Sequence, residues 1–233
     1  MTASMTAGRR AGPPAGTVWR ARHPAGESTI LPDGCMDLIW TGRRVLVAGP
    51  DTGPYRYRAD SAESMVGLRL PPGVAPGVLG HPAERLRDRR VDLADLWSDT
   101  EADRWCSLLS EADDPAAVLD DIARTRMWDA PAWLAPAAAD LAAGVRVGEC
   151  AERFGMTVRT FHRHSSRFYG YGPKTLQRIL RMRAALGDLA AGRDLTASAY
   201  RHGYADEPHM HREFVELTGR GPSTFLRTTD VRA

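Results

Sequence analysis

The stretch that decides this fold is GYGP at residues 170–173, which returns 49 residues later as GRGP at residues 219–222. A second glycine is repeated upstream at nearly the same spacing, Gly155 before the first copy and Gly203 before the second. Such a glycine predicts a tight turn between two crossed helices, because a residue without Cβ adopts a positive φ at little cost. The chain therefore holds an imperfect internal duplication, and each copy is expected to form helix, turn and helix.

The second helix of each copy has a clear start and two different faces. Thr157 and Asp206 are suited to be N-caps, and Pro208 fits the first turn, where its missing N–H costs nothing. The expected buried positions, at helical spacing, are Val158, Phe161 and Phe168 in the first copy and Met210, Phe214 and Leu217 in the second. The opposite face is polar and cationic, with Arg159, His162, Arg163 and Ser166 in the first copy and His211 and Arg212 in the second.

The charge is distributed unevenly between the two parts of the chain. Residues 1–140 hold 16 arginines and 20 acidic residues, whereas residues 141–233 hold 15 basic residues, 9 acidic ones and five of the seven histidines. A single helix-turn-helix also occurs in plain helical bundles, but a tandem pair on a basic segment favours DNA. A helix of this kind fits the major groove, and the basic side chains supply phosphate contacts.

A long helix is expected between the two copies. Its apolar and central positions are Leu176, Ile179, Leu180, Arg183, Leu186 and Leu189, and it should start after Pro173 and stop at Gly192. Such a rigid connection would let one chain read two half-sites in successive major grooves, about 34 Å apart.

These residues resemble the AraC/XylS transcription regulators, whose DNA-binding domain is two helix-turn-helix units joined by a long helix. The resemblance covers roughly residues 134–230, and its most specific stretch is GYADEPHMHREF at residues 203–214, continuing to TGRGP at residues 218–222. It implies base-facing roles, foremost for Arg163 and Arg212, at Arg159, His162, Arg163, Glu207, Pro208, His211 and Arg212. Two departures, Ser165 for an aromatic residue and Ser198 for an aliphatic one, put the local packing of each unit in question.

The amino-terminal part reads as a separate, mostly β domain. Residues 1–16 are rich in Gly, Ala and Pro and are expected to be a disordered tail. Five short strands are predicted, at residues 18–22, 36–40, 44–48, 55–58 and 64–70, which suits a small barrel or sandwich. Helical periodicity then runs to a linker at residues 131–136. The prediction is an α+β chain with a regulatory domain at 17–130 and an all-α DNA-binding domain at 131–233.

This part resembles the reduced cupin-like sensor domains that precede some AraC-type DNA-binding domains, through LPDGCMDLI at residues 31–39 and GLRLPPG at residues 67–73. The resemblance implies a domain that encloses a small effector, supplies a dimer contact, or does both. Candidate effector-contacting residues are Cys35, Asp37, Trp40, Tyr55, Tyr57, Arg69 and His81. Each also has an ordinary structural explanation: a small buried thiol for Cys35, a turn cap for Asp37, and core packing for the aromatic residues.

Other classes of protein receive little support. Histidines two apart, at 162 and 164 and at 209 and 211, face different sides of a helix, and the three cysteines have no paired spacing. No metal, no cofactor and no enzymatic activity are therefore expected. The chain lacks a secretory or membrane-spanning apolar run, and few cysteines suit a reducing compartment, so a soluble cytoplasmic protein is expected.

The sequence thus predicts a transcription regulator that binds promoter DNA under the control of a small effector, with RNA polymerase and a second copy of the chain as further candidate partners. Two alternatives stay open. One is an alkyl-acceptor or thiol-reactive sensor that uses Cys35, although no cysteine-metal cluster is present to activate the thiol. The other is a constitutive DNA-binding dimer that responds to no effector.

Overall fold

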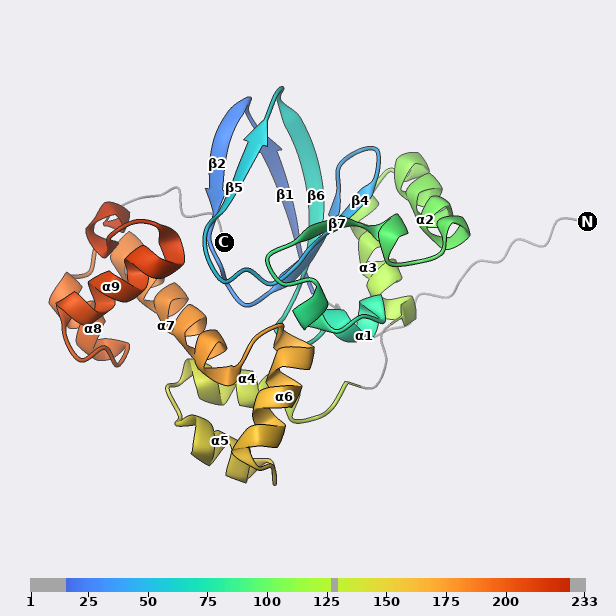
Figure 1. Cartoon of the computed structure of the whole chain (residues 1–233). Coiled ribbons are helices and arrows are strands. Elements are labelled where there is room, and N and C mark those ends of the chain that lie inside the picture. The colour runs from blue at the N-terminus through green and yellow to red at the C-terminus, as the bar shows by residue number, and fades with distance from the viewer. Residues whose placement is uncertain (1–15, 127–129, 227–233) are drawn as a thin grey trace, which may run out of the picture.

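A computed structural model of the chain describes residues 16–126 and 130–226. Its amino-terminal half is an antiparallel β structure with helices on one side, and its carboxy-terminal half is entirely helical (Figure 1). The strands within the described residues are β1 Thr17–His23, β2 Gly26–Ile30, β3 Met36–Trp40, β4 Val45–Ala48, β5 Tyr55–Ala59, β6 Glu63–Leu70 and β7 Arg90–Asp92. They form a five-stranded sheet in the order β1-β6-β3-β4-β7 and a two-stranded ribbon, β2-β5.

The register of the main sheet follows from alternation along β3. Met36, Leu38 and Trp40 point into the core, while the residues between them are only partly buried. Because side chains alternate between the two faces of a strand, Asp37 lies on the other face, opposite Arg69 of β6.

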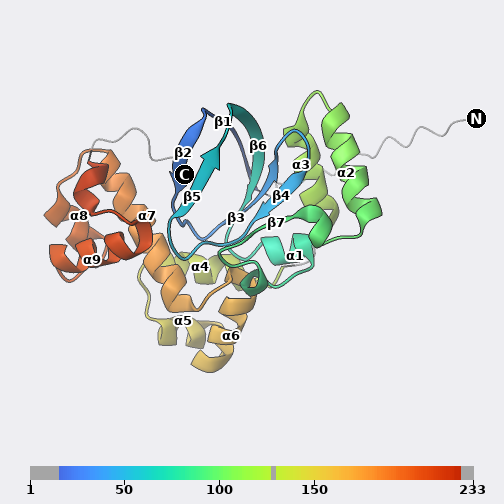
Figure 2. The same cartoon turned by 45° about the horizontal axis from the view of Figure 1, so that its top comes forward.

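Helices complete the amino-terminal core. The helices are α1 Ala75–Leu79, α2 Asp99–Glu111 and α3 Pro115–Arg126, with two 3₁₀ turns, η1 Ala83–Arg85 and η2 Leu93–Asp95. Leu38 and Leu68 of the sheet and Ile122 of α3 share one fully buried cluster. Both views show α2 and α3 on the side of the sheet far from α8 and α9 (Figures 1 and 2).

The carboxy-terminal half has a second core built around one long helix. Its elements are α4 Leu134–Ala142, α5 Val147–Arg153, α6 Val158–Tyr169, α7 Pro173–Ala190, α8 Leu195–Arg201, α9 Glu207–Thr218 and the 3₁₀ turn η3 Pro222–Phe225. Leu176, Ile179 and Met182 of α7 are fully buried in a cluster shared with α6 and α9. We call α5–α6 the first unit and α8–α9 the second unit; α7 joins them (Figure 2).

The predicted α+β fold class and the two helix-turn-helix units are confirmed, and β3 has the predicted bounds. The sequence missed β2, β7 and the short helix α1. It was wrong about the linker at residues 131–136, since α4 begins at Leu134 inside it. It was also wrong to bury Val158, which is 53% exposed because it is the first residue of α6 and lies outside the core. Most of the predicted disordered tail, residues 1–15, lies outside the described residues.

Candidate nucleic-acid interface

The first unit presents a cationic helix face to solvent. The turn contains Gly155 at φ 65°, and α6 starts at Thr157, whose side chain accepts a hydrogen bond of 3.1 Å from the backbone N–H of Thr160. Because Phe161 is fully buried, the opposite face of the helix is turned outward. The side chains expected to read DNA lie there: Arg159, His162 and Arg163 are exposed and Ser166 is half-buried.

The second unit repeats this arrangement with different chemistry. Asp206 caps α9 by accepting a 2.6 Å hydrogen bond from the backbone N–H of His209, and Met210 anchors the helix in the core. The expected reading residues Glu207, Pro208, His211 and Arg212 are all exposed. Glu207 also accepts a hydrogen bond from the hydroxyl of Thr196 on α8, so one oxygen of its carboxylate already has a partner within the second unit.

The arginines on these faces differ from several other arginines of the same half. Within residues 16–126 and 130–226, no carboxylate forms an ion pair with Arg159, Arg163 or Arg212. Among the other arginines of this half, Arg153 lies 2.6 Å from Asp140 and Arg146 pairs with Glu149, whereas Arg167, Arg183 and Arg220 have no ion pair within the described residues. Three exposed guanidinium groups without an ion pair in the described part of the chain, those of Arg159, Arg163 and Arg212, therefore lie where the helices present their reading faces.

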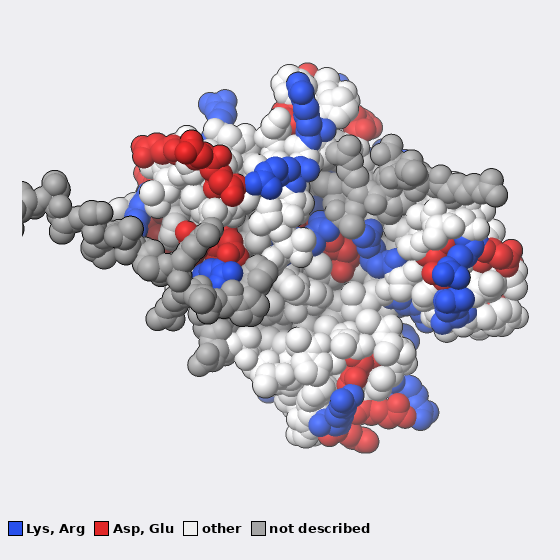
Figure 3. All heavy atoms as spheres, turned by 180° about the vertical axis from the view of Figure 1, so that it is seen from behind, with Lys and Arg blue, Asp and Glu red and all other residues white. Residues whose placement is uncertain are grey.

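Figure 3 shows one result of this pairing. On the face seen from behind, basic and acidic side chains lie next to one another on the lower lobe instead of forming one continuous basic surface. Net charge is thus a poor guide to where DNA would bind, and the unpaired arginines on α6 and α9 are the better one.

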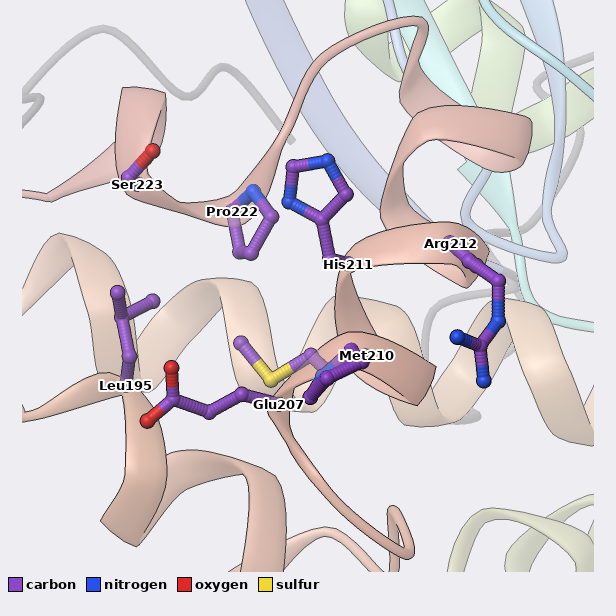
Figure 4. Close-up of a pocket in the computed structure, with 8 residues that line it drawn as sticks. Leu195, Glu207, Met210, His211, Arg212, Pro222 and Ser223 are labelled. Carbon is purple, nitrogen blue, oxygen red and sulfur yellow. The ribbon is translucent and has the colours of Figure 1, made fainter.

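A shallow hollow of about 430 Å³ lies beside the start of α9. Figure 4 shows His211 next to Pro222 on one side of it and Glu207 near Leu195 on another. Its lining combines apolar side chains with expected reading residues, namely Leu195, Glu207, Pro208, Met210, His211, Arg212, Pro222 and Ser223. Apolar side chains thus lie beside the expected reading residues of the second unit.

Both serines that depart from the family pattern are buried. The Ser165 hydroxyl donates a 3.0 Å hydrogen bond to the carbonyl of Tyr171, so it ties α6 to the following loop. Ser198 is 1% exposed, and its hydroxyl has no hydrogen-bond partner among the described residues. The departure at Ser165 is thus accommodated by a specific bond, whereas the one at Ser198 leaves a polar group unsatisfied, which costs stability.

The sequence interpretation missed the residues that hold the two reading helices in place. Trp133, just before α4, packs with its ring centroid 5.8–6.1 Å from those of Phe161, His164, Phe168 and Tyr169 around α6. In the second unit, Arg178 and Arg181 of α7 bind Glu213 of α9. An acidic residue on the apolar stripe of α9, between Met210 and Phe214, was a usable indication in the sequence.

The candidate effector residues do not come together in one place. Cys35, Asp37 and Arg69 form one group: Arg69 lies 3.3 Å from Asp37 and 3.2 Å from Asp33, whose other oxygen accepts a hydrogen bond from the Cys35 N–H. The turn cap is therefore Asp33, not Asp37.

The other candidates have separate structural contacts. Trp40 is buried in the sheet core, and Tyr55 lies under the Arg90 guanidinium, 3.9 Å from it. Tyr57 donates a hydrogen bond to Glu63, and a ring nitrogen of His81 lies 3.0 Å from the Leu96 carbonyl oxygen. Neither the hollow at α9 nor a second one, between α5, α7 and α8, is lined by any of the seven candidates.

The Cys35 thiol is in a poor environment for chemistry. Burial, together with the negative charge of Asp33, raises the pKa of Cys35 to about 12 and outweighs the opposing effect of Arg69. Because the thiolate is the reactive form, this environment disfavours the alkyl-acceptor alternative.

The loop before β3 rests on α7. A Cβ placed on Gly34 would lie 3.1 Å from a methyl carbon of Leu176 and 3.5 Å from one of Leu180. Arg87, after η1, donates a hydrogen bond of 3.4 Å to the carbonyl of Gly170 at the end of α6. The amino-terminal half thus contacts both the first unit and the connecting helix.

Two further classes of site are not found. In the described part of the chain, no three His, Cys, Asp or Glu side chains are grouped so that they could hold a metal ion. No helix within the same residues combines the length and apolarity needed to cross a membrane.

Solved structures similar to the chain include three of ToxT from Vibrio cholerae. The 1.65 Å structure has 10% identity and a TM-score of 0.48, covering 90% of this chain and 97% of ToxT. The structure of ToxT from strain O395 has 10% identity and a TM-score of 0.49, and the match covers 93% of this chain and 99% of ToxT. The structure of unsaturated fatty acid-bound ToxT from strain SCE256 has 11% identity and a TM-score of 0.48, and the match covers 93% of this chain and 97% of ToxT. Likeness at this level does not tell what this chain binds.

Family models match both halves of the chain. Residues 150–228 match a helix-turn-helix domain and residues 17–92 match a domain of unknown function, DUF6597. Among curated proteins, none matches the sequence. The first match begins within α5 and continues through α6, α7, α8 and α9, and the second runs from β1 to β7. The chain therefore carries an AraC-type helix-turn-helix domain behind a DUF6597 domain, and it is a DNA-binding regulator of transcription.

Proposed function

We propose that this regulator reads a bipartite operator, with α6 in one major groove and α9 in the next. The reading residues are Arg159, His162, Arg163 and Ser166 for the first half-site and Glu207, Pro208, His211 and Arg212 for the second. The observation that carries the proposal is the exposure of Arg159, Arg163 and Arg212 without an ion-pair partner in the described ranges. Such guanidinium groups are free to donate in bidentate fashion to guanine.

In this proposal, the amino-terminal half, residues 17–130, modulates how the two units bind the operator. Its support is the contact of Gly34 with α7 and of Arg87 with the end of α6, which lets a change in one half reach the other. A small effector is the proposed input. A homodimer, a contact with RNA polymerase and a place of action in the cytoplasm stay predictions from the sequence.

The test is selection of genomic DNA fragments by the purified protein at a stated salt concentration, repeated with Arg163→Ala and Arg212→Ala. The expected motif has two half-sites about one helical turn apart. Each substitution should lower discrimination in its own half-site, by about 1–3 kcal/mol at one base pair.

The matched control is Arg153→Ala, which removes the same charge from an arginine that is already paired with Asp140. It should leave both half-sites intact. A uniform loss of affinity on all sequences for Arg163→Ala and Arg212→Ala would show that these side chains contact only phosphate, and the assignment of reading residues would be wrong.

A further inference from the structure

One buried carboxylate holds the second reading helix against α7. Glu213 of α9 is only 4% exposed, and both of its oxygens are occupied. Oε1 accepts a 3.0 Å hydrogen bond from Nε of Arg181, while Oε2 accepts one of 2.6 Å from Nη2 of Arg181 and one of 3.0 Å from Nε of Arg178. Both arginines belong to α7, so α9 is joined to the connecting helix by three charge-assisted bonds.

Arg181 also contacts the turn that precedes α9. Its Nη1 donates to the Gly203 carbonyl at 3.4 Å, and its guanidinium lies 4.4 Å from the centre of the Tyr204 ring. One side chain of α7 thus fixes the turn and the helix of the second unit together.

The directionality of these bonds matters for reading. Met210, Phe214 and Leu217 also hold α9 against the core, but the hydrophobic effect that drives their burial is not directional, whereas hydrogen bonds are. A rotation of α9 by about 20° would move an atom 6 Å from the helix axis by about 2 Å, which is enough to break a base contact. Three hydrogen bonds to Glu213 oppose this rotation, and the neighbouring residues His211 and Arg212 turn with the same helix.

The first unit is held by other means. The residue 49 positions before Glu213 is His164, whose ring stacks on Trp133 with the centroids 5.9 Å apart and the planes at 26°. Among the described residues, no ion pair joins α6 to α7. A change at Glu213 should therefore affect the second half-site alone.

We propose that Glu213 is a positioning residue for the second unit: through Arg178 and Arg181 it sets the rotation of α9, and so decides which base edges His211 and Arg212 reach. This inference rests on the proposed bipartite reading. The unchanged protein therefore serves as the first arm of the test, because failure to select two half-sites would refute the proposed function itself.

The second arm compares Glu213→Gln with Glu216→Gln in the full chain. Each substitution removes one negative charge from α9, and each removes it from a carboxylate that pairs with Arg178. The two sites differ in burial, since the side chain of Glu213 is 5% exposed and that of Glu216 is 64% exposed. Glu213→Gln should lower discrimination among second half-site sequences by about tenfold and leave the first half-site unchanged. Glu216→Gln should change neither. Equal discrimination in the two variants, with both half-sites still selected by the unchanged protein, would overturn the role of Glu213.

A third arm separates positioning from simple stability. Glu213→Leu combined with Arg181→Met replaces the charged partners by apolar side chains, which often restores stability to a buried site. All binding is measured at a temperature at which each variant is folded. Loss of second half-site discrimination in the paired variant supports positioning. Recovery of that discrimination along with stability would show that Glu213 is merely structural.

Discussion

His162 lies directly over Gly172, since a Cβ added to that glycine would come 2.4 Å from Nε2 of the imidazole. The second unit repeats the relationship, with a Cβ on Gly221 falling 2.8 Å from Cε1 of His211. Both glycines have ordinary φ values, −64° and −71°, so backbone freedom does not explain them. The third residue of the repeated GxGP motif is glycine because the histidine of the reading helix occupies the space where a side chain would be.

Gly172→Ala should move the His162 ring and weaken the preference of the first half-site. The exposed ring can shift, so the free energy of unfolding should change by only about 0.5 kcal/mol. Fragment selection and urea unfolding measure the two effects. Gly221→Ala is the matched variant and should act only on the second half-site; an unchanged first half-site in Gly172→Ala would contradict the steric explanation.

Tyr171→Phe should leave the stability unchanged or raise it slightly. Tyr171 is 2% exposed, and its hydroxyl has no hydrogen-bond partner in the described part of the chain, so its removal relieves an unsatisfied polar group. The control is Tyr169→Phe, which loses a 2.7 Å hydrogen bond to the Leu134 carbonyl and should cost about 1 kcal/mol. Urea unfolding of both variants tests this, and a larger loss for Tyr171→Phe would reverse the assignment.

Glu213 should make stability depend on pH in the acid range. Burial opposes its ionisation, but hydrogen bonds and charge from Arg181 and Arg178 outweigh burial and hold the pKa of Glu213 below its usual value of 4.5. A carboxyl whose pKa is lowered in the folded state stabilises the protein above its unfolded pKa, and this contribution disappears as the pH falls through the folded value.

The free energy of unfolding should therefore fall more steeply below about pH 4.5 in the unchanged protein than in Glu213→Gln. Parallel acid dependence in the two proteins would show that the carboxylate gains nothing from its arginine partners.

Cys35 should resist alkylation in the folded protein. With the pKa of its thiol raised to about 12 by burial, almost no thiolate is present near pH 8. Mass spectrometry after iodoacetamide should find Cys35 unmodified in native protein and modified in denatured protein. Rapid labelling of native Cys35 would revive the thiol-reactive alternative.

A fragment of residues 131–233 should fold and bind DNA with reduced stability. Its core surrounds α7 and is mostly its own, but removal of the other half uncovers the Tyr169 ring, which lies against Gly73, and the Leu176 side chain that Gly34 contacts. Circular dichroism and a binding titration would check both properties. An unfolded fragment would place the domain boundary elsewhere.

Local patterns were read well from the sequence because they depend on neighbours along the chain. The caps Thr157 and Asp206 and the glycine turns at 155 and 203 were all predicted, and all are confirmed. β2 was missed because its sequence, GESTI, has little apolar alternation and pairs with β5 in a two-stranded ribbon outside the main sheet.

Contacts between distant segments could not be read in the same way. The pairing of Glu213 with Arg178 joins residues 35 positions apart, and that of Asp37 with Arg69 depends on the register of β3 against β6. The exposed position of Val158 followed from how α6 packs, which periodicity alone does not fix. The assignment of reading residues stays a prediction that fragment selection can decide.

The length of α7 has a consequence for the DNA as well as for the protein. Its 18 residues form a rod about 27 Å long, fixed to the second unit by Glu213 and to the other half through Gly34. An operator read by both units must then keep its half-sites in helical phase. Five extra base pairs would turn the second half-site by about half a turn, to the opposite side of the duplex, whereas a substitution within the spacer would be tolerated. Target promoters should therefore conserve the distance between half-sites more strictly than the bases that separate them.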